Sequence, residues 1–354
     1  MVPLTTGFTQ ETPLHPAAKS LIGELFAKGW ADPAKVHRAS REISILLGKA
    51  KATFAEHLNV DISQLEFLGE PDLGFQLGIA GMISEKCKIA HSQIDRQPVH
   101  AICRELSRSG HEVEILPVDK SGQIKIGQSK PEVMIWQVAN GETGNFQTEQ
   151  PAGYRTFLDC TTSGIDTDIP KDYEVALFDS TAWTGPSGLG ILVIKKSNNW
   201  KYPLAHIDAI RSPKTFSIPL MIASAVALEN YAKELNKARE NAKGLSTQFI
   251  KTLQGSIPNL QIASDLENRQ FKYLSLIIPG IDGEQLKNEL AESGIDIDSG
   301  SACKSADLRP SHVLVAMGFG TTGNIRITFK PEHTSTDIKQ LADAIITKTN
   351  SLKN

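Results

Sequence analysis

Short apolar runs alternate with helical stretches along most of this chain of 354 residues, and this alternation restricts the fold more than any other feature. Runs that are apolar throughout and separated by helices are typical of strands buried on both faces of a sheet. The pattern therefore predicts an α/β fold with a mainly parallel sheet and helices on both of its faces. The runs are residues 65–68, 87–90, 111–117, 133–138, 156–159, 175–178 and 190–195.

A long helical stretch over residues 219–253 separates this pattern from a smaller one of the α+β kind. We expect a large domain over residues 15–225, and a small domain formed by residues 226–354 together with residues 1–14. The elements predicted for the small domain are a strand (273–278), a helix (283–293), a helix (310–317), a strand (324–329) and a helix (336–347).

Composition excludes several classes of protein. The chain has 37 basic and 40 acidic side chains and a net charge of −3, which argues against a strongly basic nucleic-acid binder. No apolar run approaches the roughly 18 residues of a membrane-spanning helix. The four cysteines form no CxxC pair, and the nine histidines show no metal-ligand spacing. We expect a reduced, cytoplasmic protein without a metal site.

A few residues are candidates for chemistry from their positions alone. Asp159 ends an apolar run, where α/β folds place groups that contact ligands, although a helix-capping role is equally consistent with that place. His91 lies at the end of another run, and a structural role is the simpler interpretation for it. Cys303 lies in a loop of small residues beside Lys304, whose charge would favour the thiolate; an incidental loop cysteine is the alternative.

Several motifs together give the chain a resemblance to a known family. Residues 110–119 read GHEVEILPVD, residues 278–284 read IPGIDGE, and residues 299–312 contain SGSAC followed by RPSH. These motifs resemble those of the class V aminotransferase fold, in particular the cysteine desulfurases. The resemblance implies the PLP-transferase fold type I, with a seven-stranded, mainly parallel sheet and a smaller α+β domain.

The resemblance also implies a set of functional positions. Family chemistry uses pyridoxal phosphate (PLP), which acts as an electron sink. By analogy, His91 stacks on the coenzyme ring and Asp159 pairs with its pyridine nitrogen. Arg326 binds the substrate carboxylate as a fork, and Cys303 accepts sulfur from cysteine as a persulfide.

Further cofactor positions are implied by the same comparison. Asn140 is retained from an asparagine motif of the family, and Thr162 stands where the family has glutamine. Thr215 matches a residue that reaches the phosphate of the neighbouring subunit. The resemblance therefore implies a homodimer.

The family lysine that binds PLP covalently is not present. The family reads S-x-H-K-x-x-G-P-x-G, whereas residues 179–188 read DSTAWTGPSG, so that Ala182 stands in the lysine position. The phosphate site changes as well, because Asp179 replaces the serine and residues 70–72, Glu-Pro-Asp, replace the phosphate-binding turn. At ~5 Å and an effective dielectric constant of ~20, the repulsion between each carboxylate and one unit charge of the phosphate is about 3 kcal/mol before screening by salt. We therefore expect PLP binding to be weak or absent.

Three functions remain open at this point. The leading one is a cysteine desulfurase-like protein with lost or strongly altered PLP catalysis. It would carry persulfide on Cys303 or act as a partner or regulator of an active desulfurase paralogue or of iron–sulfur assembly proteins. The second is an active desulfurase or lyase that transfers sulfur from L-cysteine to Cys303, using noncovalent PLP or a substitute lysine. The third is an altered enzyme that binds a cationic ligand at the acidified phosphate site.

Overall fold

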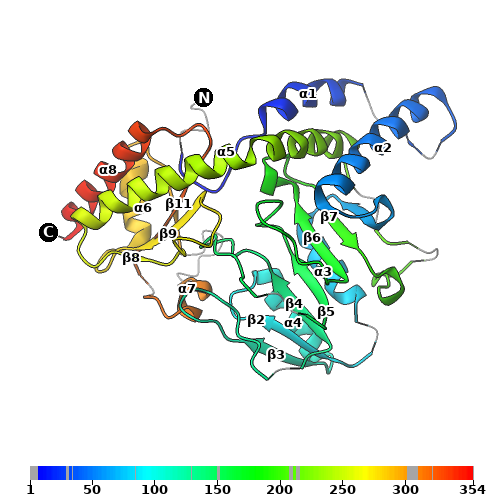
Figure 1. The fold of residues 1–354 in the computed structure, drawn as a ribbon, viewed down its shortest axis with the longest axis horizontal. Helices are drawn as coiled ribbons and strands as arrows, with labels where there is room; N and C mark the ends of the chain where they lie inside the picture. Colours follow the sequence, from blue (N-terminus) through cyan, green and yellow to red (C-terminus); the bar gives the residue numbers. More distant parts are fainter. Residues whose placement is uncertain are drawn as a thin grey trace.

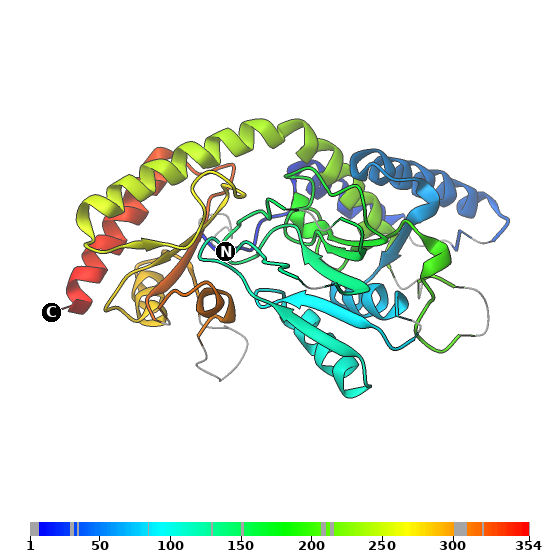
Figure 2. The same cartoon turned by 60° about the horizontal axis from the view of Figure 1, so that its bottom comes forward.

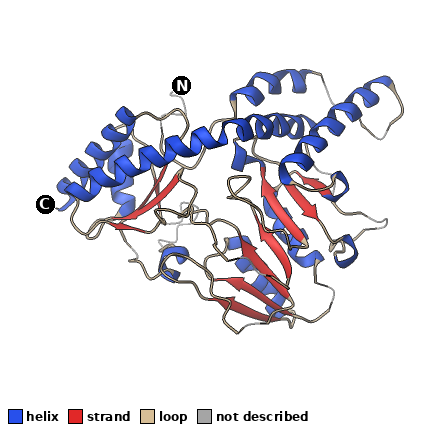
Figure 3. Cartoon of the chain, viewed as in Figure 1, coloured by secondary structure: helices blue, strands red, loops and turns tan. Residues whose placement is uncertain are grey.

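The molecule consists of two sheets that one long helix, α5 (Ile218–Ser256), connects (Figure 1). Figure 3 shows the strands in two separate groups, with helices around each group. The computed structural model describes residues 7–28, 32–33, 35–83, 85–128, 130–149, 152–206, 210–212, 216–300, 310–320 and 322–353.

The large sheet has seven strands in the order β1-β7-β6-β5-β4-β2-β3. Strands β3, β2, β4, β5 and β6 pair in parallel, whereas β7 is antiparallel to both β6 and β1. This topology confirms the predicted mainly parallel sheet. The strands are β1 (Leu65–Leu68), β2 (Lys88–Ser92), β3 (Glu112–Leu116), β4 (Val133–Gln137), β5 (Arg155–Asp159), β6 (Val175–Asp179) and β7 (Gly190–Ile194).

Alternate residues of the central strands face two different layers of helices. In β4, Val133 and Ile135 pack in the cluster that contains α3 and α4. Met134 and Trp136 pack in the other cluster, with α1, α2 and the first part of α5. Because successive side chains of a strand point to opposite faces, helices cover both faces of the sheet, as predicted. These helices are α1 (Pro16–Ala27), α2 (Arg38–Leu58), α3 (Pro71–Gly81) and α4 (Gln97–Arg108).

The second sheet is antiparallel, with the strand order β10-β11-β9-β8. It packs with the C-terminal half of α5, α6 and α8 around a core of its own, in which Phe8 of the N-terminal segment is also buried. Figure 2 shows α5 passing over both sheets, with α8 beside its far end. The elements are β8 (Gln261–Ile262), β9 (Tyr273–Ile277), α6 (Gly283–Glu292), β10 (Asp298–Ser299), α7 (His312–Ala316), β11 (Asn324–Thr328) and α8 (Ser335–Lys353).

Short 3-10 helices complete the large part. One of them, η3 (Ser180–Trp183), follows β6 directly and contains Ala182. Two others are η2 (Ile62–Gln64), which precedes β1, and η4 (Ser197–Asn199), which follows β7. Among the described helices, none combines the length and hydropathy that crossing a bilayer requires.

Candidate functional site

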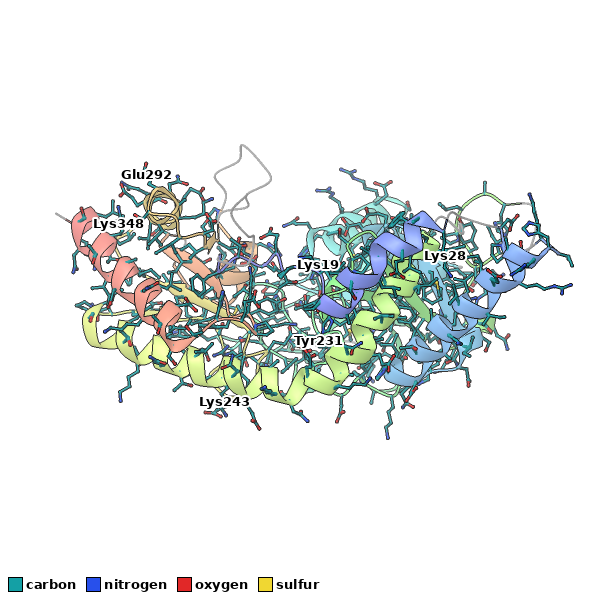
Figure 4. All side chains as sticks on the ribbon, turned by 90° about the horizontal axis from the view of Figure 1, so that it is seen from above. Lys19, Lys28, Tyr231, Lys243, Glu292 and Lys348 are labelled. Atoms are coloured by element: carbon teal, nitrogen blue, oxygen red, sulfur yellow. The ribbon has the colours of Figure 1, made fainter. Side chains whose placement is uncertain are left out.

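A cavity of about 650 Å³ lies where the carboxyl end of the large sheet meets α5 and the segment before β9. The loops after β5 and β6 contribute Thr162, Asp179 and Ala182 to its lining, and α5 contributes Tyr231, which Figure 4 labels. Lys272 enters from the segment before β9. Clefts beyond the carboxyl ends of parallel strands are the usual ligand sites of such folds.

The amine of Lys272 lies beside Ala182, although the two residues come from different parts of the chain. Ala182 is 6% exposed. The Nζ of Lys272 donates to the backbone oxygen of Ala182 at 3.2 Å and to the hydroxyl of Tyr231 at 3.2 Å. It also lies 3.0 Å from Oδ2 of Asp166. An ammonium group has three N–H donors, and these three acceptors use all of them.

Asp166 holds Lys272 in its charged form. The Tyr231 hydroxyl donates to Oδ1 of Asp166 at 2.6 Å, and the side-chain amide of Gln270 donates to Oδ2. Burial by itself disfavours the ammonium, but the charge and hydrogen bond of Asp166, together with Tyr231 and Tyr273, outweigh it and raise the pKa of Lys272 well above its ordinary value. The group formed by Lys272, Asp166, Tyr231 and Gln270, which we name the lysine cluster, is therefore an internally neutralised ion pair.

Asp159 ends β5, as the sequence predicts, and its carboxylate is buried. The backbone amide and the hydroxyl of Thr161 donate to Oδ1 at 2.9 and 2.6 Å, and Nε of Arg96 lies 3.6 Å from Oδ2. Arg96 also donates to Oγ1 of Thr162 at 2.7 Å. Burial raises the pKa of Asp159, against the opposing effects of Arg96 and Thr161. Arg96 thus connects two of the predicted positions, Asp159 and Thr162.

Carboxylates from the chain itself occupy two helix N-termini close to this cavity. Glu70 is the N-cap of α3 and accepts from the amide of Asp72 at 3.1 Å. Asp179 is the N-cap of η3 and accepts from the amide of Thr181 at 2.8 Å. Burial raises the pKa of Asp179, and the charge of Glu70 adds to that effect. Backbone amides that could bind an anion at a helix N-terminus are therefore already in use.

His91 and Asn140 lie behind the cavity, outside its lining. His91 is 2% exposed on β2, and its Nδ1 lies 3.6 Å from Oδ2 of Asp95. The amide nitrogen of Asn140 donates to Oε1 of Gln137 at 3.1 Å, and its oxygen accepts from the amide of Glu142 at 2.9 Å. Both predicted residues therefore belong to a buried polar network.

The remaining predicted positions lie elsewhere. Arg326 is half-buried on β11, where it faces Asp298 of β10 and lines a separate small pocket. Cys303 and Thr215 lie outside the described residues. Across the described ranges, no group of three or more His, Cys, Asp or Glu side chains could hold a metal ion.

The sequence reasoning missed the residues that dominate the cavity. Arg96, Asp166, Tyr231 and Lys272 are not part of any motif that the sequence shows. Asp166 follows β5 in the same loop as Thr162, so the strand-end rule could have identified it. Tyr231 and Lys272 carry no such signal, because the fold alone brings them to this loop.

Curated proteins that the chain resembles share one description. The cysteine desulfurase IscS of Dictyoglomus turgidum is 23% identical over 96% of this chain and 92% of its own length. The cysteine desulfurase of Gluconacetobacter diazotrophicus is 25% identical over 94% of this chain and 90% of its own length.

Solved structures agree on the fold, which is that of the PLP fold type I proteins. A NifS-like protein superposes with a TM-score of 0.86 at 22% identity, covering 98% of this chain and 99% of the other. The apo cysteine desulfurase of Thermococcus onnurineus gives a TM-score of 0.83 at 14% identity, covering 98% and 94%. The family model described as aminotransferase class-V matches residues 20–341. The chain therefore belongs to the class V aminotransferase family and is a cysteine desulfurase-like member of it.

Proposed function

We propose that this protein keeps the cysteine desulfurase fold but has lost, or strongly altered, PLP-dependent catalysis, and that it acts as a partner or regulator in sulfur transfer. The observation that carries the proposal is the lysine cluster beside Ala182. The position that tethers PLP in the family has no amine, and the described amine that contacts it, that of Lys272, is bonded to Ala182, Tyr231 and Asp166.

At the other positions that contact PLP in the family, this chain places charged groups that oppose its binding. In the family, the aspartate at the position of Asp159 pairs with the protonated pyridine nitrogen of PLP. Here the guanidinium of Arg96 lies against that carboxylate, so a pyridinium would have to displace one cation to bind another. At the phosphate end, Asp179 and Glu70 cap the helix termini with negative charge. The residues present do not fit PLP.

The proposal assigns a chemical role to Cys303. We propose that it serves as a persulfide carrier, that the protein forms a homodimer, and that its partners are an active desulfurase paralogue or iron–sulfur assembly proteins. We place it in the cytoplasm, with a large domain over residues 15–225 and a small one over residues 226–354 and 1–14. The two curated relatives named above support the link to sulfur chemistry, since both carry the name cysteine desulfurase.

A second candidate function follows from the same cluster. Because Nζ of Lys272 lies 3.2 Å from the backbone oxygen of Ala182, Lys272 is the described lysine best placed to substitute for the family lysine. In that case the protein is an active PLP-dependent desulfurase or lyase that uses L-cysteine. The ion pair with Asp166 opposes this role, because a protonated amine is not a nucleophile.

A PLP titration followed by visible absorbance separates the two candidates. We expect no protein-bound PLP band in the wild type, in Lys272→Met or in Ala182→Lys, because Arg96 and the carboxylates remain in each. The Dictyoglomus turgidum desulfurase serves as the positive control. A band in the wild type that disappears in Lys272→Met and survives in the control Lys243→Met, an exposed lysine on α5 (Figure 4), would establish the second candidate. A band that persists in Lys272→Met would show noncovalent binding and would contradict the leading proposal.

A further inference from the structure

The short helix α7 is fixed to the large sheet by polar contacts at its N-terminus. Nε2 of His312 donates to the backbone oxygen of Asp95 at 2.9 Å, and the amide of Gln97 donates to Nδ1 of His312 at 3.2 Å. The hydroxyl of Ser311 donates to Oε2 of Glu142 at 2.6 Å. These contacts join α7, which lies beside the end of β2 in Figure 1, to the turn that follows that strand and to the N-terminus of α4. Because a carbonyl oxygen can only accept, Nε2 of His312 carries a proton.

Apolar side chains complete this contact. Val313, Leu314 and Met317 pack in one cluster with Ile94, which belongs to the same turn after β2. The cluster also contains Ala263, Ile277 of β9 and Phe319, so α7 packs on the second sheet as well, and the polar contacts add to Ile94 in joining it to the large sheet. A helix of this length has no stability of its own and depends on its packing.

His312 is the outermost of three histidines whose rings form a row of edge-to-face contacts. Its ring lies 5.2 Å from that of His100, centroid to centroid, at an interplanar angle of 86°. The His100 ring in turn lies 4.9 Å from that of His91, at 79°. The three residues come from α7, α4 and β2, so this histidine row connects α7 to the interior of the large sheet.

The middle ring of the histidine row is held in its neutral form. Burial lowers the pKa of His100 from its ordinary value of 6.5, and the neighbouring rings of His91 and His312 lower it further. The carboxylate of Asp95 and a hydrogen bond with the Gln93 backbone act in the opposite direction without reversing the shift. Cys103, one turn along α4, is a buried thiol whose pKa is raised, so it adds no charge. Nε2 of His100 has no hydrogen-bond partner within the described part of the chain.

We propose that the histidine row is a pH-sensitive clasp. It holds α7 on the large sheet when His100 is neutral and releases α7 when His100 is protonated. A charge on His100 would lie between two imidazole rings, and its buried Nε2 has no hydrogen-bond partner among the described residues. Because the pKa of His100 is lowered in the docked state, the undocked state takes up the proton more readily. Docking is therefore strongest above the ordinary value of 6.5 and weakens as the pH falls from there towards the lowered pKa.

This clasp has a consequence for the neighbouring sequence. Helix α7 is the first described helix after Cys303, and residues 301–309 precede it. Release of α7 would therefore break the contacts that join the first described helix after Cys303 to the large sheet. The clasp does not depend on PLP, so it holds whether or not the protein is an active desulfurase.

Hydrogen exchange of the full-length protein tests the clasp. Amide protection of residues 313–317, corrected for intrinsic exchange, is compared between about pH 8 and about pH 5, across the range in which histidine titrates. We expect protection to fall by up to about tenfold per pH unit below the ordinary histidine value, because undocking takes up one proton. His100→Gln, which cannot titrate, should keep its protection, whereas the exposed control His206→Gln should respond as the wild type does. Unchanged protection in the wild type, or an equal loss in His100→Gln, would overturn the proposal.

A second measurement guards against a variant that disturbs packing at every pH. The ring proton of His100 is followed by NMR in the wild type across the same pH range. The proposal requires it to titrate below 6.5, in step with the loss of α7 protection. Titration at or above the ordinary value, or titration without any change in α7, would contradict it.

Discussion

The interior of the large sheet and the cavity at its carboxyl end are stabilised by different interactions. In the interior, apolar side chains of β4 alternate between two helix layers, one of which also packs against Ala182 and Tyr231 of the cavity lining. In the cavity, by contrast, two carboxylates, the buried Asp159 and the partly buried Asp166, each have a cation beside them, Arg96 and Lys272. The family fold can therefore persist while the chemistry of its site changes, because apolar packing stabilises the sheet whereas charged and polar side chains determine what the cavity can bind.

The largest expected effect on stability comes from breaking the ion pair of the lysine cluster in the cavity. Lys272→Met leaves the largely covered carboxylate of Asp166 without its cation, and breaking a fully buried pair costs about 3–5 kcal/mol of unfolding free energy, so we expect a loss of up to about 3 kcal/mol here. The effect is measured by urea denaturation. Lys243→Met, on an exposed part of α5, should change stability by less than about 0.5 kcal/mol.

A double variant shows whether the cost arises from the stranded charge. Asp166→Asn together with Lys272→Met removes both charges, and the asparagine can still bond Tyr231 and Gln270. We expect it to recover most of the lost stability. A Lys272→Met protein as stable as the wild type would mean that the lysine cluster does not stabilise the cavity.

The next effect concerns packing in the interior. A Cβ on Gly78 of α3 would lie 2.3 Å from Cε2 of Phe157 on β5, so Gly78→Ala requires the helix or the ring to move. Overpacking costs about 1–3 kcal/mol, and the gain in helix propensity offsets about 0.5–1 kcal/mol of it.

The matched control for this variant is Gly48→Ala on α2, where a Cβ would meet nothing within 4 Å. It should increase stability by about 0.5–1 kcal/mol. Thermal unfolding of both variants measures the difference between them. Equal effects at the two sites would show that the contact between α3 and β5 is looser than the structure has it.

The smallest effect tests Asp179, a carboxylate that forms no ion pair with the described residues. Burial raises the pKa of Asp179 above its ordinary value of 3.8, so the folded state binds the proton more tightly than the unfolded state. The charged group therefore costs stability at neutral pH, and that cost disappears as the pH falls through the raised pKa towards 3.8.

Asp179→Asn keeps a good N-cap residue for η3 but removes the charge. We expect it to be more stable than the wild type at about pH 7, by on the order of 1 kcal/mol or less, with no difference at about pH 3. Melting temperatures of the two proteins at several pH values measure this. A destabilised variant at neutral pH would show that a cation compensates Asp179.

The fold was predictable from sequence because its strands carry a strong local signal. The run at residues 133–138 is apolar throughout, and β4 is completely buried. Helix α1 was not predicted, because only Ala18 and Leu25 of its residues are buried and the remaining pattern is weak. The two-residue strands β8 and β10 are too short to show a period.

The site was only partly predictable, for reasons of geometry. Asp159 and Thr162 lie at the cavity because strand ends in parallel sheets meet at one edge. His91 was expected at the coenzyme ring, yet its side chain lies on the same face of β2 as that of Ile89, which packs towards α4. The contact between Lys272 and Ala182 joins residues far apart in the chain, and no local pattern encodes such a contact.

Borohydride reduction of the wild-type protein in the presence of excess PLP tests the central claim most directly. Reduction makes any imine between a lysine and PLP permanent, and peptide mapping by mass spectrometry then locates it. With a lysine cluster that is neutralised and fully bonded, we predict an unmodified Lys272 and no stoichiometric adduct at any lysine. A stoichiometric adduct on Lys272 would contradict the loss of coenzyme chemistry and identify that residue as the substitute lysine.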